Sequence, residues 1–449
     1  MFPCNDPKLA INGGAPVRVA RWAENLTLGE EETRAACEVL AGGRLSLFEG
    51  SHQPEPPFSF WGGPWIQRLE QAWCDYYGCR YAVTVNSATS GLYASVGALG
   101  IGYGDEVIVS PHTMSACAAC ALVYGAVPIF ADVQLDTACL DPDSITAHIT
   151  PRTRAIVVVH QFGTPADMDP IMALARQHGL KVIEDCAQAH GARYKGRYVG
   201  TIGDIGVFSL NVNKTIQTGE GGLCTTNDPE LRYRLALIRN HGEAVVEAAG
   251  YEDITNIVGF NYRLTELQAA IGLEQLRRLD YFNRARIQYA DLLNTALSRY
   301  SCCVPMVPGY GDAKSVSTFY VFNFRYLDEG LGVPRAALIA ALNAEGMCFG
   351  PGYTAPLYLQ PLYQRKLAFK HGYPFAAPEN QLIETNYFPG ACSKAELLAG
   401  QVISCEAVRL PHTLADMHQI VEAVDKVLSC LSNVAPSLAR KQASGSPAA

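Results

Sequence analysis

Residues 81–226 alternate between short apolar segments and segments with helical spacing, and this alternation limits the possible folds more than any other feature. The apolar segments are continuous, which is typical of parallel strands that are buried on both faces. We therefore predict an α/β fold with a largely parallel central sheet covered by helices on both faces. The expected strands are 81–85, 106–109, 127–131, 155–159 and 181–184, and the expected helices are 92–99, 113–124 and 168–178.

The length and the change of pattern along the chain predict two domains and two extensions. A chain of 449 residues is too long for one ordinary core. Residues 1–28 are punctuated by Pro and Gly and predict an N-terminal arm, and 29–285 form the expected large domain. A helical pattern that runs on to about residue 298 predicts a connector, and 286–432 then form a smaller C-terminal α+β domain. Residues 433–449 are expected to be a disordered tail.

Charge and composition argue against several classes of protein. The net charge is −8 and no long basic block is present, which argues against a nucleic-acid-binding surface. No run of about 18 apolar residues predicts a membrane span, and the N-terminal sequence does not have the pattern of a secretory signal. The 15 cysteines are scattered and contain no paired C-x-x-C motifs, so we expect buried free thiols in a reducing cytoplasm instead of a metal site.

Polar residues follow several of the predicted strands. Asp185 follows strand 181–184, Ser209 follows the apolar run 205–208, and Lys214 lies in the next polar loop. Sites in parallel sheets lie beyond the carboxyl ends of the strands, so these side chains are expected at one edge. After strand 81–85, the turn NSATSG leads into a helix, a geometry that points backbone N–H groups at an anion. An ordinary helix cap explains that turn equally well.

The residue types at this edge are those that pyridoxal 5'-phosphate (PLP) requires. A buried aspartate such as Asp185 needs a partner, and a protonated pyridine nitrogen is one; the alternative is a structural acid. Glu184 is expected to point to the opposite face of its strand. Lys214 could form an imine if it loses its proton, although most lysines are simply exposed. For His190, a structural role satisfied by the local backbone is as good an explanation as contact with cofactor or substrate.

Several longer segments resemble one enzyme family. EDCAQAHGARYKGRYVGTIGDIGVFSLNVNKTIQTGEGG, RNHGE and GFNYRLTELQAAIGLEQL closely resemble the DegT/DnrJ-type sugar aminotransferases, which are fold type I PLP-dependent enzymes. The resemblance covers roughly residues 60–430. It implies that Lys214 binds PLP covalently and then shuttles the proton between the cofactor and the substrate carbon. It also implies that Asp185 pairs with the pyridinium nitrogen and that Gln188 lies near the ring hydroxyl.

The resemblance also assigns the phosphate site and predicts a homodimer. Ser209 and the backbone around Ala88 and Thr89 would hold the phosphate, and Asn261 would reach the phosphate of the neighbouring subunit. Two positions depart from the family pattern. Ala88 replaces the usual glycine, and Met114 stands where an aromatic ring usually covers the cofactor, a role that a thioether can also fill.

The activity that the resemblance implies is transfer of an amino group from glutamine or glutamate to a keto-sugar or keto-cyclitol. A weaker resemblance of EDCAQ, GTIGDIG and APLYLQPLY to cyclitol (inosose) aminotransferases points to aminocyclitol antibiotic biosynthesis. His190, His241, Arg263 and Tyr353 are candidate substrate contacts, and a core or loop role explains each as well. One alternative is a PLP-dependent nucleotide-sugar dehydratase or deaminase, although the dehydratase branch has His where this chain has Lys214. Another is a non-catalytic PLP-binding sensor or regulator.

Overall fold

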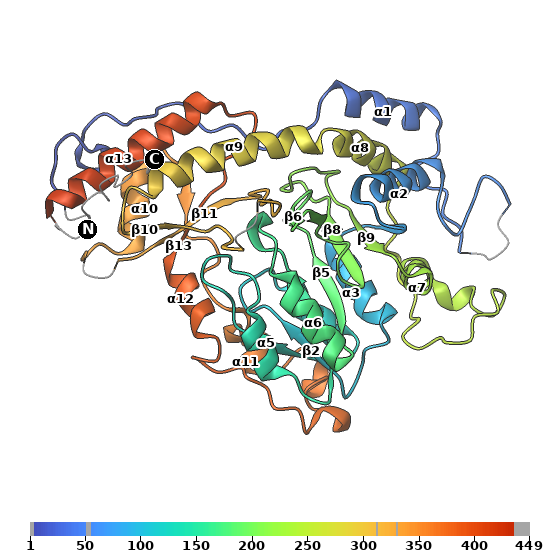
Figure 1. Cartoon of the computed structure of the whole chain (residues 1–449). Coiled ribbons are helices and arrows are strands. Elements are labelled where there is room, and N and C mark those ends of the chain that lie inside the picture. The colour runs from blue at the N-terminus through green and yellow to red at the C-terminus, as the bar shows by residue number, and fades with distance from the viewer. Residues whose placement is uncertain (1–3, 51–54, 311–312, 329–330, 435–449) are drawn as a thin grey trace, which may run out of the picture.

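The computed structural model describes residues 4–50, 55–310, 313–328 and 331–434, and its centre is a seven-stranded sheet in the order β1-β9-β8-β5-β4-β2-β3 (Figure 1). All neighbouring pairs from β8 to β3 are parallel, and β9 alone runs against both of its neighbours. The predicted α/β class with a largely parallel sheet is therefore confirmed. The strands are β1 (Tyr81–Val85), β2 (Glu106–Val109), β3 (Val127–Phe130), β4 (Thr153–Val159), β5 (Lys181–Asp185), β8 (Ile205–Ser209) and β9 (Gly222–Thr226); β6 (Arg193–Tyr194) and β7 (Arg197–Tyr198) form a small separate hairpin.

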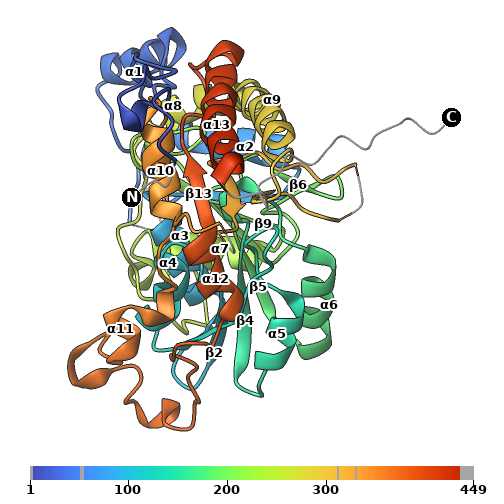
Figure 2. The same ribbon diagram turned by 90° about the vertical axis from the view of Figure 1, so that its left-hand side faces the viewer.

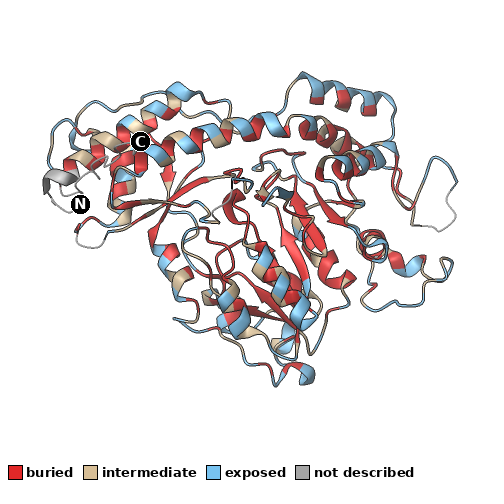
Figure 3. Ribbon diagram, in the orientation of Figure 1, coloured by how far each residue is buried: buried red, intermediate tan, exposed pale blue. Residues whose placement is uncertain are grey.

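Helices cover both faces of this sheet, which explains why its strands contain continuous apolar runs. On β2, Val107 packs into the core on one face and Ile108 into the core on the other. The first face carries α3 (Ala88–Ala98), α4 (Ala116–Val123) and α7 (Pro229–Arg239), and the second carries α2 (Pro64–Tyr77), α6 (Met168–His178) and α8 (Glu266–Arg277). Helix α1 (Glu30–Ala41) packs on α8, and α5 (Pro142–His148) adds Ile145 to the second core. Figure 3 shows the buried residues concentrated in the strands.

The connector to the second domain is two helices instead of the single long one that the sequence predicts. α8 ends at Arg277 and α9 (Leu279–Leu297) begins after a break at Arg278. α9 then runs to a second sheet and packs on α13 (Leu414–Val434) (Figure 1). This four-stranded sheet is antiparallel and contains β10 (Cys303–Pro305), β11 (Phe322–Tyr326), β13 (Val402–Cys405) and β12 (Phe349–Gly350), with α10 (Arg335–Ala344) beside it.

The segment between β12 and β13 returns to the large sheet and covers its edge strand β3. The Asn386 amide accepts from the Phe130 N–H at 3.2 Å and donates to the Phe130 carbonyl at 2.6 Å. The Tyr387 hydroxyl donates to the Pro128 carbonyl at 2.6 Å. These contacts satisfy backbone groups that an edge strand otherwise leaves open. Figure 2 shows this segment, with α11 (Pro361–Gln364), below the smaller sheet, where it leads into α12 (Ser393–Gln401). The predicted C-terminal domain, 286–432, therefore includes a segment that packs on the large sheet.

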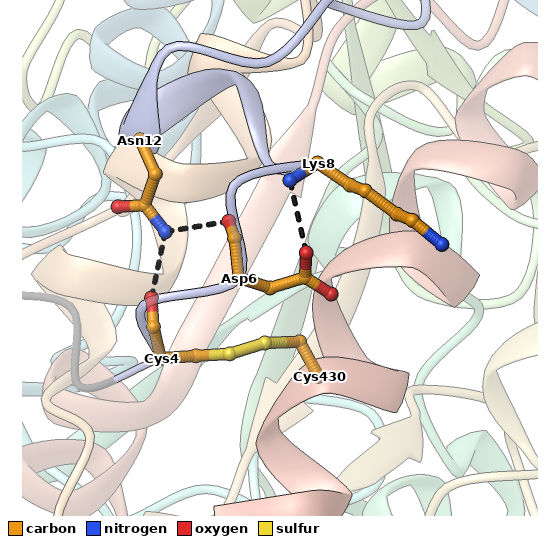
Figure 4. The surroundings of a disulfide bond; sticks show 5 residues. All are labelled: Cys4, Asp6, Lys8, Asn12 and Cys430. Atoms are coloured by element: carbon orange, nitrogen blue, oxygen red, sulfur yellow. Dashed lines mark hydrogen bonds between the residues drawn. A yellow bond between two sulfur atoms is a disulfide. The ribbon is translucent and has the colours of Figure 1, made fainter.

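The N-terminal arm lies against the smaller domain. Leu9 is buried there, and Arg18 forms an ion pair with Asp416 at 2.6 Å. Cys4 and Cys430 are joined by a disulfide between the arm and α13 (Figure 4), so the prediction of free thiols is wrong for these two cysteines. The other 13 are free. The predicted tail lies largely outside the described residues, and within the described parts no helix has the length and apolarity to span a membrane.

Candidate active site

The strand register brings the predicted polar residues to one edge of the large sheet. Asp185 pairs with Val207 on β8, two residues before Ser209. Ser209 pairs with Gly222 on β9, and Gly222 pairs with Val85 at the end of β1. The end of β5, the end of β8 and the turn after β1 are therefore neighbours, as expected for a site at the carboxyl edge.

Asp185 is held by donors on both carboxylate oxygens. It is 5% exposed. The Ala187 N–H donates to Oδ1 at 2.9 Å, and the Cys117 thiol donates to Oδ2 at 2.8 Å. The neighbouring Glu184 turns away, as predicted, and bonds to His160 and to the backbone of the 200–203 loop. Asp185 is therefore the carboxylate of the pair that faces the site.

Lys214 extends from a loop whose two sides are joined at its base. Leu210 N–H donates to the Gly221 carbonyl and Thr218 N–H donates to the Leu210 carbonyl, both at 2.8 Å. The Lys214 Nζ lies 4.6 Å from the centre of the Tyr320 ring. Burial lowers the pKa of Lys214 from its ordinary value, and the nearby Asp185 charge opposes part of that effect. A lysine with a lowered pKa is more often in the neutral form, which is the form that acts as a nucleophile and base.

A wall of aromatic rings stands beside Gln188. The Gln188 amide accepts from the Phe162 N–H at 2.8 Å and donates to the Tyr353 hydroxyl at 3.1 Å. The Phe162 and Tyr353 rings are stacked with centres 6.1 Å apart, and His112 packs edge-on against both. Burial raises the pKa of Tyr353 to about 12, so its hydroxyl keeps its proton at neutral pH.

A cavity of about 670 Å³ opens between the two sheets beside these residues. The large domain contributes Phe162, Gln188 and Asn213 to its lining, and the C-terminal part contributes Tyr320, Tyr353 and Arg409 among others. The Nε of Arg409 is buried and has no hydrogen-bond partner among the described residues. The sequence did not reveal Tyr320 or Arg409, because no motif marks them and both lie far along the chain from Lys214.

The turn after β1 provides a fitting site for a phosphate. Ser87 caps α3 by accepting from the Ser90 N–H at 3.0 Å, and the N–H groups of Ala88 and Thr89 have no acceptor within the helix. A side chain at Gly222 would have its Cβ 2.8 Å from the Ala88 nitrogen, so only glycine lets β9 approach this turn. One sheet edge thus holds backbone N–H groups that can bind an anion, the Asp185 carboxylate and the Lys214 amine. This set of groups fits PLP.

Two other predicted residues, Met114 and Asn261, are exposed. Met114 is 60% exposed. Asn261 is exposed, and its carbonyl accepts from the Asn86 side chain at 3.3 Å, next to the phosphate turn of the same chain.

The histidines and Arg263 do not line the cavity. His190 is buried against Trp73 and Phe208, and burial lowers its pKa to about 3. His241 is half exposed, and Arg263 donates to the Asn240 side chain at 2.9 Å. Their roles in substrate binding stay predictions, as does a structural role.

The fold and the grouped lysine, aspartate and phosphate turn define the class of PLP-dependent aminotransferases. Residues 58–378 match the DegT/DnrJ/EryC1/StrS aminotransferase family, and the chain belongs to that family. PLP is therefore its cofactor, and amino-group transfer is its reaction.

Individual relatives cover two thirds or more of the chain. An L-glutamine:2-deoxy-scyllo-inosose aminotransferase from Streptoalloteichus tenebrarius is 34% identical over 94% of this chain and 97% of that protein. GDP-perosamine synthase from Caulobacter vibrioides is 41% identical over 67% of this chain and 79% of its own length. Among solved structures, an aminotransferase from Psychrobacter cryohalolentis is 30% identical and has a TM-score of 0.76, covering 93% of this chain and all of its own.

Proposed function

We propose that this enzyme transfers the amino group of L-glutamine to a keto-cyclitol of the 2-deoxy-scyllo-inosose type, a step in aminocyclitol antibiotic biosynthesis. The observation that carries this proposal is the similarity to glutamine:inosose aminotransferases from end to end, at 34% identity over 94% of the chain. Similar relatives from Streptomyces fradiae and Streptomyces kanamyceticus, with the same printed activity, cover comparable shares of the chain.

Each group at the site has a task in this proposal. When bound, PLP withdraws electrons from the substrate carbon and carries the amino group between two substrates. Lys214 takes the proton from the α-carbon of the donor and later delivers a proton to the acceptor carbon. Asp185 would keep a proton on the ring nitrogen, and Gln188 would lie beside the ring hydroxyl. Ser209 and the N–H groups of Ala88 and Thr89 bind the phosphate.

Arg409 is proposed to bind the carboxylate of the amino-acid donor. It lines the cavity, and its buried Nε lacks a partner among the described residues. A carboxylate accepts two parallel N–H bonds from a guanidinium group, which also fixes its orientation. Glu406 also lines the cavity, and its negative charge would repel a donor carboxylate that lay beside it instead of at Arg409. The donor carboxylate would then lie at Arg409 and its α-carbon near Lys214.

The proposal includes an assembly and a location. The enzyme would act in the cytoplasm as a homodimer, in which Asn261 reaches the phosphate of the neighbouring subunit. The exposure of Asn261 beside the phosphate turn supports this, because an exposed polar residue there is available to a second chain. Met114 would cover the cofactor ring in place of an aromatic side chain.

A nucleotide-linked keto-sugar is the second candidate acceptor. It is favoured by the 41% identity to GDP-perosamine synthase, although that match covers less of the chain. The test offers the purified enzyme L-glutamine together with either 2-deoxy-scyllo-inosose or a nucleotide-linked keto-sugar. We expect amine product from the inosose, and Lys214→Ala should form none.

Other outcomes of this experiment would contradict the proposal. Amine formed only from the nucleotide sugar would assign the second acceptor. Loss of water or ammonia from a sugar without an amine product would support the dehydratase or deaminase. An enzyme that binds PLP but leaves glutamine unchanged would support the sensor.

A further inference from the structure

Cys117 makes a contact with Asp185 that the reaction does not by itself explain. The residue lies on α4, and its sulfur is 2.8 Å from Asp185 Oδ2 with both residues buried. An ionised carboxylate only accepts hydrogen bonds, so the thiol must donate. The hydroxyl of Thr113 lies 3.7 Å from the same sulfur, and it is the donor there because the thiol proton is already used. The result is a directed chain from Thr113 through Cys117 to Asp185.

The surroundings keep Cys117 in its donating form. Burial raises the pKa of the Cys117 thiol well above its ordinary value, and the negative charge of Asp185 adds to the effect. The other titratable groups near Asp185 are the thiols of Cys120 and Cys186, the amine of Lys214 and the hydroxyl of Tyr353. In the described structure, it is the thiol of Cys117, and none of these four groups, that forms a hydrogen bond to the Asp185 carboxylate.

We propose that Cys117 is a positioning residue, which fixes the rotation of the Asp185 carboxylate so that the group faces the ring nitrogen of PLP. Ala187 N–H holds Oδ1 and Cys117 holds Oδ2, so neither oxygen can turn away. A thiol is a weak donor. It therefore orients the carboxylate while withdrawing little of the negative charge that keeps the ring nitrogen protonated. The inference rests on the proposed role of Asp185.

The test compares variants with and without a donor at position 117. Cys117→Ala removes the donor, and Cys117→Val is a second donor-free variant of larger volume. Cys117→Ser keeps a donor. Cys120→Ala is the matched control, because Cys120 is also fully buried on α4 but donates to the Cys117 carbonyl instead of to Asp185. Thermal unfolding of each apoenzyme identifies the variants that fold, and either donor-free variant is sufficient.

Two measurements besides activity report on the contact. The first is the dissociation constant of PLP, followed by quenching of tryptophan fluorescence in the apoenzyme. The second is the nitrogen chemical shift of ring-¹⁵N-labelled PLP in the holoenzyme across a pH series. We expect the donor-free variants to bind PLP about fivefold more weakly and to lose the ring proton at lower pH. Cys117→Ser and Cys120→Ala should stay within about twofold of the parent enzyme, a difference too small for a lost hydrogen bond.

The possible results distinguish a failure of the role proposed for Cys117 from a failure of the role proposed for Asp185. Parent-like PLP affinity and ¹⁵N titration in a folded donor-free variant would overturn the role of Cys117. The same losses in Cys120→Ala would assign the effect to packing of α4, and would also overturn it. Asp185→Asn serves as the reference: if it leaves the ¹⁵N titration unchanged, the assignment of Asp185 fails, and that of Cys117 fails with it.

Discussion

Replacement of Glu184 by Gln tests whether the carboxylate on the far side of β5 holds the fold together. Oε1 of Glu184 accepts from the N–H groups of Ile202 at 2.7 Å and Gly203 at 2.6 Å. Oε2 accepts from the Gly200 N–H at 2.8 Å and from His160 Nε2 at 2.9 Å. The Ala166 N–H donates to His160 Nδ1, so the ring proton must be on Nε2. The carboxylate therefore faces four donors and no acceptor.

The loss of folding stability expected for Glu184→Gln follows from these four hydrogen bonds. A glutamine in the same place offers one oxygen and one NH₂ group, so two of the four donors meet another donor. Each buried donor that loses its acceptor costs about 1–3 kcal/mol, and the expected loss is therefore about 2–6 kcal/mol. Such a loss is a large share of the total stability of an ordinary domain, about 5–15 kcal/mol. Glu184→Gln should thus lower the denaturant midpoint strongly.

The pH dependence of folding stability tests the same hydrogen bonds in a second way. Burial by itself would raise the pKa of Glu184, but the hydrogen bonds from His160, Gly203 and Gly200 lower it below its ordinary value. A carboxyl whose pKa is lowered by folding contributes stability above its unfolded pKa of about 4.3, and this contribution is lost as the pH falls through the folded value. The parent protein should therefore lose stability in acid more steeply than Glu184→Gln.

The assay is denaturant unfolding of the apoenzyme from neutral pH down to about pH 3, followed by circular dichroism, because the Glu184 contribution is lost below the unfolded pKa. Glu31→Gln is the control, because Glu31 is exposed on α1 and should change the stability by less than about 0.5 kcal/mol. A parent-like midpoint for Glu184→Gln, or an unchanged slope with pH, would refute the reasoning.

Three further substitutions test the site. Gly222→Ala would place a Cβ 2.8 Å from the Ala88 nitrogen and 2.7 Å from the Phe208 carbonyl oxygen, so it should cost about 1–3 kcal/mol of stability and weaken PLP binding in fluorescence titrations. Gly400→Ala is the control, because the helical Gly400 has open space where a Cβ would lie, and this change should stabilise the protein by up to about 1 kcal/mol. Equal effects of the two substitutions would contradict the close approach of β9 to the turn after β1. Lys214→Ala should still bind PLP but lose all transfer in a product assay, and residual turnover near the parent rate would remove Lys214 from its role. Arg409→Gln should raise KM for L-glutamine about tenfold or more with little effect on KM for the acceptor, and the reverse pattern would move the donor carboxylate elsewhere.

The large, mostly parallel sheet could be predicted from sequence because its signals are local. Continuous apolar runs identified the parallel strands, and the order of the strands along the chain implied that their carboxyl ends, and hence Asp185 and Ser209, meet at one edge. The break at Arg278 left no such signal, because the helical pattern continues on both sides of it. The disulfide of Cys4 and Cys430 spans 426 residues, and no local pattern connects such distant cysteines.

The cavity could not be predicted for a different reason. Its far wall is built from residues such as Tyr320, Tyr353 and Arg409, which reach the site only because α9 places the smaller sheet beside the larger one. Tyr353 was predicted as a candidate substrate contact, but its hydrogen bond to Gln188 depends on the packing of the C-terminal part against the large sheet.

Glu184 and Asp185 show how one strand end serves both stability and chemistry. Neighbouring residues on a strand point to opposite faces, so two adjacent acids meet different environments. Glu184 meets four donors that are fixed by the backbone and by His160, a set that leaves no room for a ligand. Among the described residues, Asp185 accepts only from Ala187 N–H and Cys117, a set that leaves part of the carboxylate for a cofactor. Loss of Glu184 should therefore act mainly on unfolding and loss of Asp185 mainly on the cofactor, even though one peptide bond joins them.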